Sequence, residues 1–78
     1  MNTERVINGI EILDVNWIST KDGCIGIILV NNRYENKVYI KEVAGLNEEL
    51  DIQNILQWGS KFPVSVASKI INHLIKEE

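Results

Sequence analysis

The sequence predicts an α+β fold in which a three-stranded antiparallel meander is followed by two helices, in the order β-β-β-α-α. Within residues 9–43, apolar side chains alternate with polar ones or form short apolar runs, a pattern typical of strands. Within residues 47–58 and 63–76, apolar side chains recur three and four positions apart, a pattern typical of amphipathic helices. The links between the expected strands are short, which favours antiparallel neighbours. The 78 residues are expected to form a single domain.

The first expected strand follows a polar stretch, residues 1–8, that is expected to be frayed or only partly ordered. The apolar residues of this strand are Ile10 and Ile12 on one face and Leu13, Val15 and Trp17 on the other. This change of face indicates either a bulge or a strand that is covered on both faces. Asp22 and Gly23 then favour a hairpin turn into the next strand.

The central strand is expected at Cys24–Val30, which has no charged residue and is apolar on both alternating faces. Gly26 within it indicates a bulge or a close backbone approach. Each large apolar side chain left in water forfeits about 1.5–3 kcal/mol, and a small domain has little stability to lose. We therefore expect both helices on one face, or one helix bridging to a partner, in a homodimer or higher cyclic assembly. In the alternative, the second helix covers the far face within one chain.

The outer strand is expected at Lys37–Val43, where lysines blunt the edge and one alternating face is wetter. The first helix is expected to begin at Asn47, a residue type that caps helices. The next residues include three acids that the helix dipole favours, Glu48, Glu49 and Asp51. Pro63 suits the first turn of the second helix.

Charge and composition exclude several classes of function. The formal net charge is -3 and no basic block exists, so duplex nucleic acid is not an expected partner. No stretch approaches the roughly 18 apolar residues of a membrane span, and the N-terminus lacks the features of a signal peptide. Cys24 is the only cysteine, which rules out a disulfide within one chain and fits a reducing compartment. We expect a cytoplasmic protein without a membrane partner.

The sequence offers little for catalysis, and we expect neither enzyme activity nor a cofactor. His73, the only histidine, is expected on the helix surface rather than in a catalytic role. Cys24 begins the most apolar strand, where a thiol stays protonated. One cysteine and one histidine cannot form a zinc site within one chain. Gly23 and Gly26 fit no phosphate-binding pattern, and the helix dipole explains the acids at 48–51 better than a cation site does.

A candidate ligand site lies where the two helices are expected to meet. Backbone N–H groups at a helix start can hold an anion, and aromatic rings stack on planar bases. The segment offers Trp58, Ser60, Lys61, Phe62 and Ser65, and the outer strand or a second subunit offers Arg33, Tyr39 and Lys41. Together these residues predict a pocket for a small anionic ligand such as a nucleotide. In the alternative interpretation, the two aromatic rings close the corner between the helices and the lysine is solvated.

Several short stretches together resemble small uncharacterised phage and prophage proteins. They are Trp17-Ile18, Gly23–Ile27, Tyr39-Ile40, Asp51, Ile55 and Trp58–Pro63. The resemblance spans most of the chain and includes no motif diagnostic of a chemistry. It implies an anti-defence role in the host cytoplasm, as a homo-oligomeric sponge that sequesters a nucleotide-like immune signal of the cyclic or ADP-ribose type. The alternative role is an inhibitor or adaptor that binds a host defence protein directly, through the outer strand and the acidic first turn.

Overall fold

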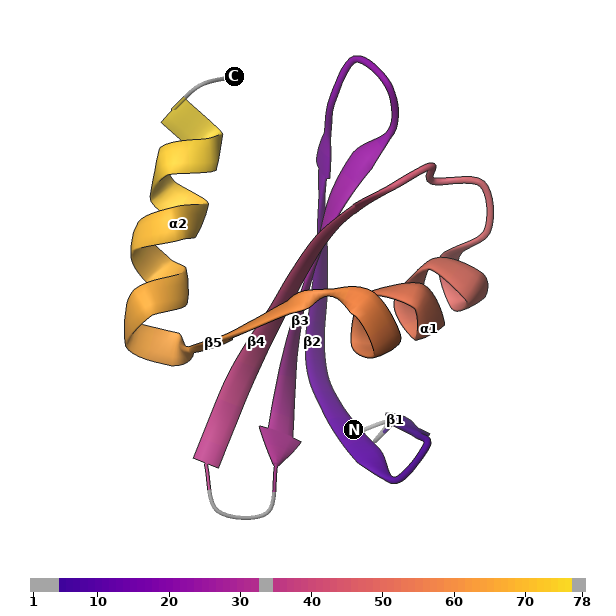
Figure 1. The fold of residues 1–78 in the computed structure, drawn as a ribbon, viewed down its shortest axis with the longest axis vertical. Coiled ribbons are helices and arrows are strands. Elements are labelled where there is room, and N and C mark those ends of the chain that lie inside the picture. Colours follow the sequence, from indigo (N-terminus) through magenta and orange to yellow (C-terminus); the bar gives the residue numbers. More distant parts are fainter. Residues whose placement is uncertain (1–4, 33–34, 77–78) are drawn as a thin grey trace.

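The computed structural model describes residues 5–32 and 35–76 of the chain (Figure 1). Five antiparallel strands form one sheet whose spatial order, β1-β2-β3-β4-β5, is also their order in the chain. The elements are β1 (Arg5–Ile7), β2 (Ile10–Ser19), β3 (Cys24–Asn32), β4 (Glu35–Val43), α1 (Glu48–Trp58), β5 (Ser60–Pro63) and α2 (Val64–Lys76). The α+β class and the antiparallel arrangement are confirmed, whereas the predicted number of three strands is wrong.

The additional strand β1 forms because Asn8 and Gly9 turn the chain tightly back into β2. Both residues have positive φ, 53° and 80°, as a two-residue type I′ hairpin turn requires. Arg5–Ile7 therefore forms a strand where the sequence predicts frayed or partly ordered chain. Residues 1–4 of that stretch lie outside the described part of the chain.

β2 changes face at a bulge, which is one of the two alternatives that its sequence left open. The pairing register with β3 shifts between Ile12 and Asp14, so that Leu13 is an extra residue. Because of this extra residue, Ile12 and Val15 lie on the same face of the sheet and pack into the same cluster. The bulge thus keeps apolar side chains of β2 on one face on both sides of the irregularity.

α1 covers one face of the sheet, which we call the near face. The buried side chains there are Ile12, Ile28, Val30, Val43, Ile52, Ile55 and Leu56. Asn47 caps the helix, because its side-chain oxygen accepts a hydrogen bond from the N–H of Leu50 at 3.2 Å. Gly26 lies beneath α1, where a Cβ would collide with Cδ1 of Ile55 and with the ring of Trp17. Gly26 therefore marks a close approach rather than a bulge.

α2 lies on the opposite face of the sheet, which we call the far face. The chain reaches this face because β5, between the two helices, pairs with β4 and passes along the outer edge of the sheet. Figure 1 shows the two helices on opposite sides of the strands. The far-face core consists of Ile27, Val38 and Ala67. The prediction of both helices on one face is therefore wrong, and the second helix covers the far face within one chain.

This arrangement removes the original reason for expecting a second copy. Each face of β3 is covered by a helix of the same chain, completely at Ile28 on the near face and in part on the far face. α2 packs mainly against β4 and β5. The far-face side chains of Ile18, Ile25 and Leu29 remain only half-buried. An assembly therefore does not follow from sheet coverage alone, although part of the far face is open.

Candidate binding site

A hollow with a volume of about 540 Å³ lies between β1 and the start of α1, and we call it the β1–α1 hollow. Its lining residues are Arg5, Val6, Ile7, Asn47, Glu48, Glu49 and Ile52. The volume falls within the range of roughly 300–1,000 Å³ that is typical of ligand pockets. The two walls come from segments that are some forty residues apart in the sequence, and the pairing of β1 with β2 brings them together.

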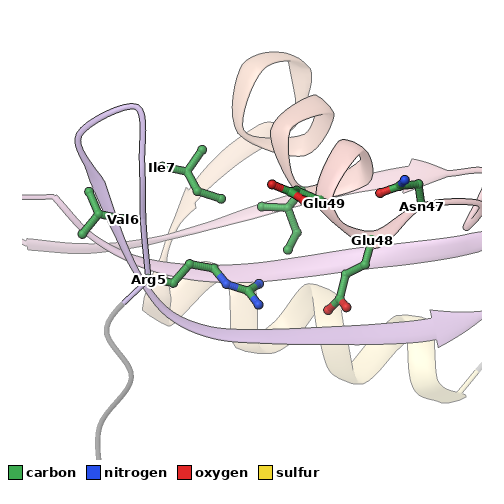
Figure 2. Close-up of a pocket in the computed structure, with 7 residues that line it drawn as sticks. Arg5, Val6, Ile7, Asn47, Glu48 and Glu49 are labelled. Carbon is green, nitrogen blue, oxygen red and sulfur yellow. The ribbon is translucent and has the colours of Figure 1, made fainter.

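The strand pairing decides which side chains of β1 enter this hollow. Arg5 lies opposite Ile12, a near-face residue, so its side chain extends beneath the first turn of α1. Val6, although it is among the lining residues, lies opposite Glu11, so its side chain is directed to the other side of the strand from that of Arg5 (Figure 2). Figure 2 shows the guanidinium of Arg5 and the carboxylate of Glu48 directed toward the same space. The alternation of β1 thus supplies one cation to a site whose other charged groups are acids.

The hollow combines both signs of charge with an apolar floor. Ile7 and Ile52 contribute apolar surface, while Glu48 and Glu49 contribute carboxylates from the first turn of α1. Within the part of the chain that the structure describes, no ion pair joins Arg5 to an acid. The guanidinium therefore remains available for a carboxylate or phosphate of a bound molecule, which it can contact with two parallel hydrogen bonds.

Two smaller hollows adjoin the first one and share Glu48 with it. One, of about 250 Å³, is lined by Arg5, Ile12, Leu13, Asp14, Val15 and Glu48. The other, of about 190 Å³, is lined by Trp17, Cys24, Gly45, Glu48 and Asp51. Glu48 therefore lies between three depressions around the helix start. Leu46 and Leu50, each two positions from Glu48 in the chain, are 89% and 62% exposed.

The residues that the sequence predicts for a ligand site are brought together only in part. Tyr39 and Lys61 face each other across β4 and β5, and Nζ of Lys61 lies 6.0 Å from the centre of the tyrosine ring. Lys41 follows two positions later on the same, near face of β4, where its Nζ donates a hydrogen bond to the carbonyl of Glu42. These three residues form a small basic and aromatic group on the near face.

The other predicted ligand residues are dispersed. Phe62 lies on the far face and packs beside Val38, while Trp58 is 70% exposed at the end of α1. Ser60 and Ser65 are exposed. Arg33 lies outside the described residues. The segment between the helices does not gather these side chains because it is a β-strand, in which successive residues point to opposite faces. The β1–α1 hollow and the two hollows beside it are lined by none of them.

Sequence reasoning missed Arg5 as a site residue because the first eight residues were expected to lack regular structure. The signal that identifies it is the Asn8-Gly9 pair, which strongly favours a two-residue hairpin turn. With that turn in place, Arg5 falls on the same face as the apolar residues of β2 and beneath α1.

The thiol and the acids near the hollows show no arrangement for metal or thiolate chemistry. Burial, with a further contribution from the charge of Asp51, raises the pKa of the Cys24 thiol above its ordinary value, so the thiol is protonated at neutral pH. Within residues 5–32 and 35–76, no group of three or more histidine, cysteine or acidic side chains is placed to hold a metal ion. In the same part of the chain, no helix has the length and apolar character needed to cross a membrane.

Comparisons with protein-family models, with curated proteins and with solved structures found no match to this chain.

Proposed function

We propose that this protein is a non-enzymatic binding protein whose start of α1 docks a basic, partly apolar segment of another protein. The observation that carries the proposal is that Leu46 and Leu50, which lie on either side of Glu48 in the chain, are exposed at the helix start that lines the β1–α1 hollow. Large apolar side chains that are left exposed near a depression are typical of protein-binding surfaces. This role corresponds to the alternative prediction of an inhibitor or adaptor, acting through the acidic first turn. It does not use the predicted outer strand, because β5 pairs with β4 and covers that edge.

The charges around the hollow favour a basic partner. Glu48, Glu49 and Asp51 share the first turn of α1 with Leu50, whereas Arg5 is the one cation among the residues that line the three hollows. An apolar side chain of the partner would enter the β1–α1 hollow, and its lysines or arginines would pair with the acids at the rim. Exposed ion pairs of this kind contribute mainly to orientation and association rate, so the apolar contacts would supply most of the affinity.

A photo-cross-linking amino acid at position 50 tests the proposal, with the same amino acid at Gln57 as the matched control. Both positions are exposed on α1, but Gln57 lies at the other end of the helix, away from the hollow. We expect a partner protein that cross-links from position 50 and not from position 57. The purified partner should then bind Leu50→Asp at least about tenfold more weakly and Gln57→Asp as tightly as the parent protein. Equal binding by the two variants would refute the proposal.

A second candidate function is capture of a nucleotide-like anion, as the phage-type sponge would require. The lysine–aromatic group of Tyr39, Lys41 and Lys61 favours it, because ammonium groups attract phosphate and a tyrosine ring can stack on a base. Titration calorimetry with cyclic dinucleotides and ADP-ribose tests this function. Binding that is lost in Lys61→Gln and kept in Lys21→Gln, a lysine in the β2–β3 turn, would support it. The absence of heat with every nucleotide at millimolar concentration would reject it.

A further inference from the structure

The far face of the sheet is open over β2 and β3, and it is acidic. Its half-buried apolar residues are Ile18, Ile25 and Leu29. The strand pairing places Glu11, Asp14 and Glu42 on this face, since their partners Asn31, Leu29 and Ile25 alternate with near-face residues of β3. No lysine or arginine of the described strands lies on the far face, because the strand positions of Arg5, Lys37, Lys41 and Lys61 all fall on the near face. The uncovered area is therefore apolar with acidic edges.

α2 has the complementary character. Its apolar arc is wider than the stripe that the sheet covers: Ala67 is buried, Ile70 is half-buried and Val66 is 43% exposed. The sequence of the helix contains two lysines and no acid. On the helix surface, Lys69 is adjacent to Val66 and Ile70. We call the side of α2 that carries Val66, Lys69 and Ile70 its outer flank, and it combines two apolar side chains with one basic side chain.

We propose that two copies of this chain associate through their far faces, with the outer flank of α2 of each copy packed on the β2–β3 half of the sheet of the other. In this arrangement, Val66 and Ile70 cover Ile25 and Leu29 of the second copy, and Lys69 lies near Asp14. The contact is reciprocal, as in an interface with two-fold symmetry, so each copy covers the open area of its partner. The occupant is a second copy because the chain itself carries an amphipathic basic helix that matches the acidic, apolar area.

The geometry of the groove beside α2 supports the same pairing. A depression of about 190 Å³ separates α2 from β2, with Asp14 and Asn16 on one wall and Val64 and Ser68 on the other. The side-chain amide of Asn16 donates a hydrogen bond to Asp14 at 2.9 Å, and this bond fixes the carboxylate at the rim of the groove. The acid is therefore held where an approaching ammonium group would meet it.

Sedimentation velocity of the whole chain from about 1 μM to 1 mM tests the proposal. We expect a reversible dimer whose dissociation constant rises at least about tenfold in Val66→Glu, a change at an exposed position. Lys69→Asp and Asp14→Lys should each weaken the dimer, and the double variant, in which the two charges are exchanged, should restore it. Lys21→Asp, in the β2–β3 turn, is the charge-matched control and should leave the dissociation constant unchanged.

A protein that stays monomeric up to 1 mM would overturn the proposal. A dimer that tolerates Val66→Glu, or that the charge exchange does not restore, would also overturn it, because the contact would then lie elsewhere. Circular dichroism and thermal melting of each variant show whether the fold is kept. Since the far face and the start of α1 lie on opposite sides of the sheet, a negative result leaves the proposed protein-binding function standing.

Discussion

Gly26→Ala is the substitution whose effect follows most directly from the packing of α1 on the sheet. The added methyl group would collide with Cδ1 of Ile55 and would approach Cζ3 of Trp17 to 2.7 Å. Ile55 is fully buried, so its side chain cannot turn into solvent. The ring of Trp17 is also packed against the near-face cluster. The helix or the ring must therefore move to admit the methyl group.

The expected loss of stability follows from two opposing effects. Inserting a methyl group into a packed core costs about 1–3 kcal/mol. Replacing glycine by alanine within a strand returns about 0.5–1 kcal/mol, because the unfolded chain has less conformational freedom to lose. We expect Gly26→Ala to lower the free energy of unfolding by about 1–2 kcal/mol. A domain of this length is typically stable by about 4–12 kcal/mol, so the effect is measurable.

Urea unfolding followed by tryptophan fluorescence measures this loss. Trp58→Phe removes the exposed tryptophan and leaves Trp17, which contacts the site, as the reporter. Ile55→Val deletes the colliding Cδ1 and alone should cost about 0.5–1.5 kcal/mol. The double variant Gly26→Ala/Ile55→Val should lose less stability than the sum of the losses of the two single variants, by at least about 0.5 kcal/mol. A Gly26→Ala protein as stable as its parent, or strict additivity of the two changes, would refute the packing argument.

Three further predictions test other parts of the structure. Asn47→Ala should lower the free energy of unfolding by about 1 kcal/mol, since it removes the cap of α1, and no change in urea unfolding would contradict the cap. Phe62→Ala should lower the free energy of unfolding by about 1–3 kcal/mol because this ring packs on the far-face core. Trp58→Ala should change it by less than about 0.5 kcal/mol, because this ring is exposed. Equal effects of the two substitutions in urea unfolding would contradict the assigned exposures. The thiol of Cys24 should react slowly with a disulfide reagent at neutral pH and faster in Asp51→Asn, because the pKa of the thiol is raised by burial and then by Asp51. The free energy of unfolding should accordingly fall as the pH rises above the ordinary thiol pKa of 9.0, because the thiol ionises at a lower pH in the unfolded chain than in the folded one. A thiol that reacts as fast as free cysteine would contradict the raised pKa.

The three central strands and the first helix could be predicted because their signals are local. Alternation and apolar runs identify β2, β3 and β4, and the change of face at Leu13 indicates the bulge. Asn47 followed by acids identifies the start of α1. In each of these elements, the sequence pattern and the tertiary environment favour the same structure.

β5 could not be predicted from its own residues. Ser60–Pro63 is four residues long, ends in proline and has no neighbouring strand within hairpin distance in the sequence. It becomes a strand because α1 returns the chain to the exposed edge of β4, where Phe62 pairs with Val38. When a strand forms only because a distant segment offers it a free edge, its own residues show no strand pattern.

The placement of α2, and with it most of the candidate site, depended on that strand. The sequence shows that α2 has an apolar side but not which face of the sheet receives it. Without β5, Trp58 and Phe62 were expected at a corner between two helices on one face; with it, Phe62 belongs to the far face and Trp58 to the surface. Arg5 was missed because β1 has only three residues and shows no strand pattern of its own. The sequence indicates this strand only through the turn at Asn8 and Gly9.

The agreement between strand order in space and strand order in the chain has a consequence for folding during synthesis. Each strand finds its partner in the strand made just before it, so the sheet can grow outward from β1 as the polypeptide leaves the ribosome. Only the pairing of β4 with β5 spans more than a short turn, because α1 lies between these two strands in the chain. Topologies in which most contacts are local in sequence fold rapidly. The far face of the growing sheet therefore stays bare until α2 has been synthesised, so the packing of this helix comes later than the pairing of the strands.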